Sequence, residues 1–157
     1  MSAILPPTPT NYSVHSIVAA YGIGLIPHGY YFVKMMANAK GLATNIVPRE
    51  NLTTLKGKVS DRVWMQLAKA HGAHLNAMEN LPLFAIAMLA GNVAKIPTSE
   101  LNVLSLEYLG ARLLYMAAYM GARSEAISYV RTGLWAWSVS IPIMALVKAG
   151  KTFNELD

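Results

Sequence analysis

Four long stretches of the chain are dominated by apolar residues and carry few charges. These stretches cover residues 12–37, 63–93, 100–120 and 127–149, with approximate bounds. The hydrocarbon layer of a bilayer is about 30 Å thick, and a helix of about 20 residues crosses it. The pattern therefore predicts an all-α integral membrane protein, a four-helix bundle that forms a single domain.

Breaking residues mark the ends of these stretches. Pro97 and Glu100 predict a turn and a helix start before the third stretch, and Gly121 with Arg123 separates it from the fourth. The second stretch holds roughly 30 residues, which at about 1.5 Å each span roughly 45 Å. We therefore expect its early part, around Lys69, to lie in the headgroup region or beyond it.

The distribution of Lys and Arg predicts the orientation. The loop at about 38–62 contains five basic residues against two acidic ones, and Arg123 falls on the same side of a four-span protein. Because cytosolic loops are enriched in Lys and Arg, we predict that both basic loops face the cytosol and both termini the lumen or exterior. Residues 1–11 lack the basic region of a signal peptide, so the first stretch is expected to be a retained span.

Composition supports the membrane assignment and narrows the chemistry. Of 157 residues, 54% are hydrophobic and 13% are charged, whereas soluble domains carry about 25% charged residues. The net charge of +5 lies in loops and helix ends, so nucleic-acid binding is not expected. The chain has no cysteine, which excludes disulfides, thiolate metal sites and a cysteine nucleophile.

Polar residues gather on one face of each of two predicted helices, where spacings of three and four residues place them together. The two sets are Lys69, Gly72, Asn76 and Glu79 in the second stretch and Tyr108, Arg112, Tyr115 and Tyr119 in the third. The fourth stretch opens with Tyr129 and Arg131, followed by Trp135. Ionisable groups inside a membrane are costly and mark functional sites. We therefore predict a polar site within the cytosolic half of the bundle.

Structural explanations compete for some of these residues. Glu79 could pair with Arg112 and hold two helices together, and Tyr or Trp near helix ends usually anchors a helix at the membrane surface. One ion pair needs two charges, however, so the whole set favours a site. Glu107 is interpreted as structural. His71 and His74 share a helix face, but no third ligand suggests a metal site.

Three strings that contain these polar residues resemble the motifs of a known protein family. The string HLNAMENLPLF at 74–84 resembles the second-helix signature of the MAPEG superfamily, the membrane-associated proteins in eicosanoid and glutathione metabolism. The run from Arg112 to Tyr115, followed by Tyr119, is similar to that family's Arg-x-x-(His/Tyr)-x-x-x-Tyr pattern. The segment SYVRT at 128–132 resembles the arginine segment of its fourth helix.

The resemblance implies a homotrimer in the endoplasmic-reticulum membrane. It also implies that glutathione binds in a cytosol-facing cleft between subunits and that a lipophilic co-substrate enters from the bilayer. In this interpretation Arg131 stabilises the glutathione thiolate and Glu79 accepts from the amino group. The implied glutathione-binding residues are Asn76, Glu79, Arg112, Tyr115, Tyr119 and Arg131.

One position departs from the animal eicosanoid-forming branch. That branch has an arginine four residues before the asparagine, where this chain has Gly72. Lys69, one turn earlier, could replace its charge but not its bidentate contact with a carboxylate. The departure weakens the inference that glutathione is bound.

Three functions therefore stay open. The first is a glutathione-dependent transferase or peroxidase acting on a lipophilic substrate. The second is an isomerase or cyclase that uses no glutathione, with Glu79 as the base and Arg131 or a tyrosine polarising the substrate. The third is a non-catalytic scaffold that presents a lipid, because membership of a family does not settle function.

Overall fold

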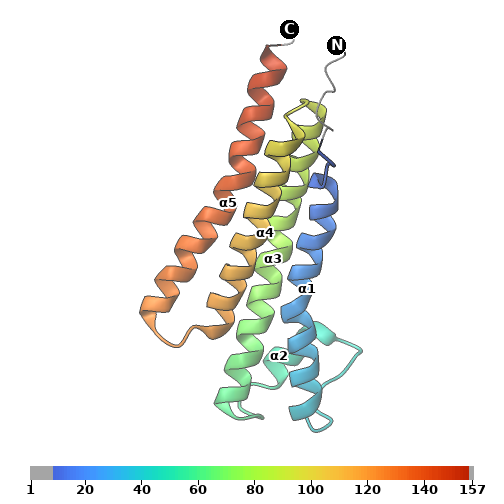
Figure 1. Ribbon diagram of the computed structural model, residues 1–157. Coiled ribbons are helices and arrows are strands. Elements are labelled where there is room, and N and C mark those ends of the chain that lie inside the picture. The colour runs from blue at the N-terminus through green and yellow to red at the C-terminus, as the bar shows by residue number, and fades with distance from the viewer. Residues whose placement is uncertain (1–8, 156–157) are drawn as a thin grey trace, which may run out of the picture.

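The computed structural model describes residues 9–155 and shows four long helices packed side by side (Figure 1). The described part contains no strand, so the all-α prediction is confirmed. The elements are α1 (Ser13–Asn38), the 3-10 turn η1 (Pro48–Glu50), α2 (Asn51–Thr54), α3 (Asp61–Val93), α4 (Thr98–Gly121) and α5 (Glu125–Asn154). The signal-peptide prediction for residues 1–11 falls mostly outside the described residues.

The four long helices coincide with the four apolar stretches, and their ends follow local chemistry. Helix α3 begins after Ser60, whose hydroxyl accepts a hydrogen bond from the Val63 N–H, and α5 begins after Ser124, which caps the Ile127 N–H in the same way. Serine is a preferred residue at this position because it satisfies a free N–H of the first turn. Helix α5 starts before and ends beyond the predicted 127–149, and α2 was not predicted.

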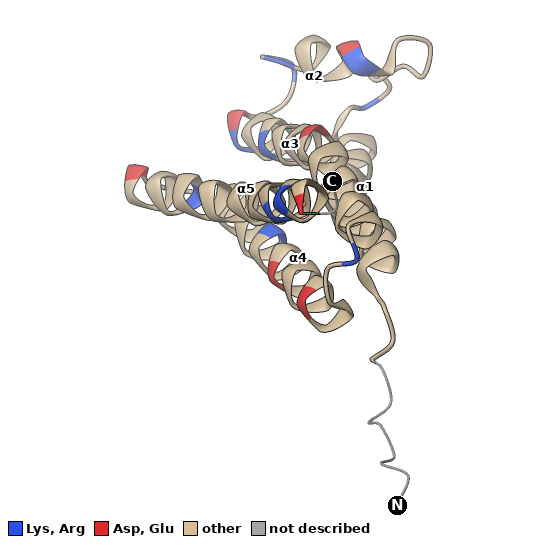
Figure 2. Ribbon diagram, turned by 90° about the horizontal axis from the view of Figure 1, so that it is seen from above, with Lys and Arg blue, Asp and Glu red and all other residues tan. Residues whose placement is uncertain are grey.

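Helices α3 and α4 form the centre of the bundle. Each contacts the other three long helices, whereas α1 and α5 do not contact each other in the described chain. Helix α5 leans away from the bundle toward its N-terminal end (Figures 1 and 2). Its buried residues begin only at Ser138, so residues 125–137 have no buried position. Space therefore remains between this half of α5 and the central helices.

The core is built from small residues around one aromatic pair. The rings of Phe84 and Tyr108 stack with their centroids 3.8 Å apart, and both side chains are at most 2% exposed. Alanines such as Ala87 and Ala111 surround them and let the helix backbones approach closely. Tyr108 therefore belongs to the core, although its spacing suggested membership of the polar face.

Only one helix in the described chain, α5, is both long and apolar enough to qualify as a membrane span by length and composition. Of its qualifying window, 22% is buried, so most of its apolar surface faces outward. The other long helices carry more polar residues, including those of the predicted site. Four membrane crossings stay a prediction from the sequence pattern.

Candidate functional site

A cleft with a volume of about 390 Å³ opens between α3, α4 and the leaning half of α5. Small-molecule sites usually measure about 300–1,000 Å³. Nine residues from the three helices line it: Gly72, Leu75, Asn76, Glu79, Tyr115, Tyr119, Arg131, Thr132 and Trp135. Five of the six predicted glutathione-binding residues are among them, and Arg112 is not.

The α3 wall of the cleft presents an amide and a carboxylate. Gly72, Asn76 and Glu79 share one face because they are separated by four and three residues. Glu79 is exposed. The Oδ1 atom of Asn76 accepts a hydrogen bond of 2.9 Å from Arg112 Nη2. Because this bond occupies the oxygen, the Nδ2 group of Asn76 is the end of the amide left to meet a ligand.

Arg112 lies behind this wall, with 4% of its surface exposed. Its Nη2 donates to the Asn76 carbonyl as well (3.1 Å), its Nη1 donates to Ser138 Oγ (3.3 Å), and its guanidinium carbon lies 4.8 Å from the centre of the Tyr115 ring. It lines a small void of about 10 Å³ rather than the cleft. The structure therefore differs from the expected pairing with Glu79: Arg112 fixes Asn76 and joins three helices.

The opposite wall combines two tyrosines with Arg131. The rings of Tyr115 and Tyr119 meet edge to face at 5.7 Å, and the guanidinium carbon of Arg131 lies 4.8 Å from the centre of the Tyr119 ring. Arg131 Nη2 also donates to Ser128 Oγ, at 2.9 Å. Both contacts are with uncharged groups. They hold the guanidinium in place without neutralising it.

The two charges of the cleft form no ion pair with any described residue. The described residues contain one ion pair, between Glu100 and Lys148, and neither residue lines the cleft. Glu79 and Arg131 therefore place a free negative and a free positive charge on opposite walls. Such a cleft suits a ligand that carries both signs of charge.

The presence of glycine at position 72 has a steric explanation in this structure. A Cβ atom at this position would lie 3.1 Å from Cζ of Tyr119 and closer still to its hydroxyl oxygen. Tyr119 thus occupies the space that a side chain at residue 72 needs. Lys69, the suggested substitute for the missing arginine, instead donates to the carbonyl of Ala122 at the end of α4 and does not line the cleft.

We expect Gly72→Ala to displace the Tyr119 ring and, with it, Arg131. A methyl group forced into a packed contact costs about 1–3 kcal/mol. Tyr119→Phe removes the atom that clashes first, so the double variant should regain part of the thermal stability that Gly72→Ala loses. Melting temperatures of the four proteins in detergent measure this; strictly additive effects would show that the two residues do not interact.

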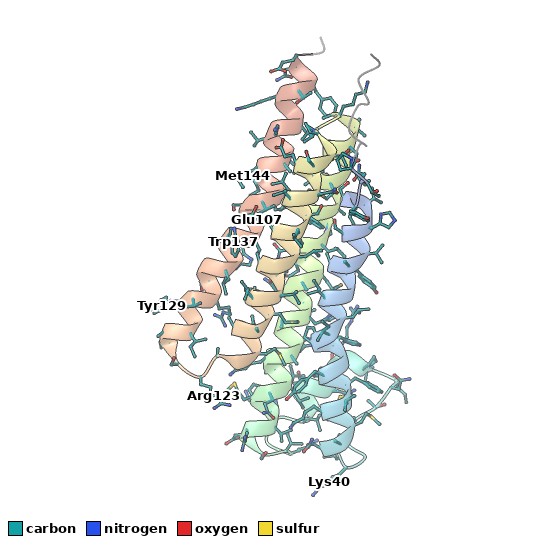
Figure 3. The ribbon with its side chains drawn as sticks, viewed as in Figure 1. Lys40, Glu107, Arg123, Tyr129, Trp137 and Met144 are labelled. Carbon is teal, nitrogen blue, oxygen red and sulfur yellow. The ribbon has the colours of Figure 1, made fainter. Side chains whose placement is uncertain are left out.

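The structure separates the residues that open the fourth predicted helix. Trp135 lines the cleft together with Arg131, whereas Tyr129 is 74% exposed and points away from the bundle (Figure 3). Residues two apart lie on nearly opposite sides of a helix, so Tyr129 and Arg131 could not share a face. Leu75 and Thr132 lie inside the two quoted family-like strings, but neither residue type suggested a role in the site.

Two polar groups outside the cleft have local partners. Trp137 Nε1 of α5 donates to Glu107 Oε1 of α4 at 3.0 Å (Figure 3), as expected of a structural contact between helices. His74 Nδ1 lies 2.9 Å from the carbonyl oxygen of Gly24, and His71 packs against the ring of Tyr31. The described residues contain no group of three or more potential metal ligands.

Comparison with known proteins gives one result. The sequence profile of the MAPEG family matches residues 14–151, which is most of the chain and includes every residue of the cleft. The match confirms the resemblance found in the sequence. No curated protein and no solved structure showed a significant match.

Proposed function

The chain belongs to the MAPEG family, and we propose that it is a glutathione-dependent transferase or peroxidase that acts on lipophilic substrates. Members of this family are membrane-bound and include transferases, peroxidases and isomerases. The proposal includes a homotrimer in the endoplasmic-reticulum membrane with the basic loops in the cytosol.

The observation that carries the proposal is the pair of unneutralised charges on opposite walls. Glutathione carries an ammonium group, two carboxylates and a thiol. Glu79 complements the ammonium group, and the Nδ2 group of Asn76 together with the hydroxyls of Tyr115 and Tyr119 can bond its carbonyl and carboxylate oxygens. Arg131 complements an anion on the opposite wall.

The chemistry requires the thiolate, because the neutral thiol is a poor nucleophile. In the proposed reaction the thiol releases its proton to water, and the sulfur forms a bond to an electrophilic carbon. The leaving group departs with the electron pair of the bond that breaks. Arg131 stabilises the thiolate through Coulomb attraction, which is stronger in a cleft that excludes water than in bulk solvent.

The second substrate would approach from the apolar side of the cleft. Large apolar side chains on the leaning half of α5 are exposed, among them Val130 (59%) and Trp135 (40%). A lipophilic electrophile or hydroperoxide is concentrated in the bilayer that would surround this surface. A neighbouring subunit of the proposed trimer would cover the remaining open face of the cleft.

Thermal stability in detergent tests the proposal directly. A ligand at about 100 times its dissociation constant stabilises the folded state by about 2.7 kcal/mol, which in a chain of this size raises the melting temperature by about 5–10 °C. We expect a rise of this size with millimolar glutathione and a much smaller one for Glu79→Gln. No rise in the unsubstituted protein would contradict glutathione binding.

A second candidate is favoured by Gly72. Without an arginine there, the cleft has one guanidinium fewer for the two carboxylates of glutathione. Glu79 could then act as the base of an isomerase or cyclase, with Arg131 polarising a carbonyl of a membrane-soluble intermediate. This candidate, like a non-catalytic lipid-presenting scaffold, gives no glutathione-dependent rise in melting temperature. Turnover of the intermediate without glutathione separates the two.

A further inference from the structure

The segment between α1 and α3 folds back along the outside of the bundle. Lys40 and Gly41 follow α1 with φ of +47° and +81°, a left-handed pair that reverses the chain direction. Helix α2 then lies beside the lower turns of α1 and α3 (Figure 1) and outside the four long helices when viewed along the bundle (Figure 2). The segment is thus placed at the rim of the bundle.

This segment is held firmly in place. Leu55 is fully buried in a cluster with Leu67 and Ala70 of α3. Asn51 is 1% exposed, and its side chain accepts from the Thr44 N–H at 2.9 Å and donates to the Thr44 carbonyl at 2.8 Å. The two bonds close the chain between residues 44 and 51 into a loop with a fixed neck, which we call the rim loop.

The tip of the rim loop is apolar and projects from the protein. Ile46 is 90% exposed and Val47 is 51% exposed. The Ile46 N–H donates to Thr44 Oγ1 at 3.1 Å, which orders the backbone at the tip. Holding an aliphatic side chain exposed to water is unfavourable, because moving apolar surface from water into an apolar environment lowers the free energy.

Basic residues lie along the chain on both sides of this tip. The segment carries five cations, all exposed, against two acidic residues, giving it a net charge of +3. The cations are Lys40, Arg49, Lys56, Lys58 and Arg62. The general enrichment of Lys and Arg in cytosolic loops explains the charge, but it does not explain a tied loop with an exposed isoleucine at its tip.

We propose that the rim loop inserts Ile46 and Val47 among the headgroups of the adjacent membrane leaflet, while the surrounding cations bind anionic lipids. Aliphatic insertion combined with a basic surround is how proteins bind negatively charged membrane surfaces. The rim position places the loop beside the membrane that a member of this family occupies. The inference does not depend on the chemistry of the cleft.

The absence of cysteine makes a direct test possible. The full-length Ile46→Cys protein is labelled with an environment-sensitive fluorophore in phosphatidylcholine nanodiscs with or without phosphatidylserine. The label should be quenched by lipids carrying a shallow spin label and shielded from aqueous iodide, most strongly with phosphatidylserine. Asn154→Cys, at the exposed end of α5, serves as the water-exposed control. Equal iodide quenching at both positions would overturn the proposal and point to a protein partner.

A second measurement tests the charges separately. In nanodiscs of mixed lipids, native mass spectrometry gives the ratio of phosphatidylserine to phosphatidylcholine that stays bound. Each cation near an anionic surface contributes about a fivefold preference, so Arg49→Gln with Lys58→Gln should lower the ratio by roughly 20-fold. Lys95→Gln, an exposed change in the α3–α4 connection at the opposite end of the bundle (Figure 1), should leave it unaltered. An unchanged ratio in the double variant would contradict anionic-lipid binding.

Discussion

Replacing Arg131 by leucine is expected to abolish thiol chemistry while leaving the fold intact. Arg131 is partly exposed at the cleft, and its contacts are with the Tyr119 ring and Ser128. The bundle therefore loses little when it is removed. In the proposed reaction the glutathione thiolate would lose the one cation among the described residues that line the cleft, and loss of one such electrostatic partner typically lowers the rate by about 100-fold or more.

The measurement is the rate of conjugation of a model electrophile at saturating glutathione. The conjugation rate of Arg131→Leu should begin to rise only at a higher pH than that of the unsubstituted protein, because the glutathione thiol then ionises less readily. Arg131→Lys retains the charge and should recover part of the rate, and Arg123→Leu, which alters an exposed arginine in the α4–α5 connection (Figure 3), should have no effect. Full activity in Arg131→Leu would remove this residue from the proposed mechanism.

Replacing Arg112 by leucine is expected to act mainly on stability. The variant loses three hydrogen bonds, to Ser138 Oγ and to both Asn76 oxygens, although Asn80 Nδ2 still donates to the Asn76 carbonyl at 2.8 Å. Hydrogen bonds to charged groups contribute about 1.5–3 kcal/mol each, and part of this is recovered by relaxation. We expect a net loss of about 3 kcal/mol, which lowers the melting temperature by roughly 6–12 °C.

The matched control is Arg62→Leu, because Arg62 is exposed in the first turn of α3. It should change the melting temperature by no more than about 2 °C, as surface substitutions usually do. Arg112→Lys keeps the charge but cannot donate from two nitrogens at once, so we expect an intermediate value. A melting temperature unchanged in Arg112→Leu would show that the Asn76 contact does not stabilise the bundle.

The helical architecture was predictable because apolar patterning alone determines it. Stretches of 20 or more apolar residues, with serine or proline at their starts, gave the four long helices to within a few residues. Helix α2 was not predictable in this way. Its four residues have no periodicity to detect, and its position depends on burial of Leu55 and on the bonds between Asn51 and Thr44.

The cleft was only partly predictable. Helical spacing determines which residues share a face of one helix, but it does not determine how closely that face packs against the next helix. The spacing placed Arg112 beside Tyr115 and Tyr119. Only the packing shows that Arg112 lies behind the wall, while Tyr119 extends over Gly72. The steric need for Gly72 involves two helices, so no local pattern could reveal it.

The unburied first half of α5 bears on how selective the cleft can be. Across residues 125–137 no side chain is buried, and the polar contacts to another helix seen among the described residues are the Arg131–Tyr119 pair and the hydrogen bond from Trp137 to Glu107, each a contribution of about 1 kcal/mol. Tilting this segment therefore costs little and changes the width of the cleft. Under the proposed function, we therefore expect the cleft to admit hydrophobic substrates of more than one size.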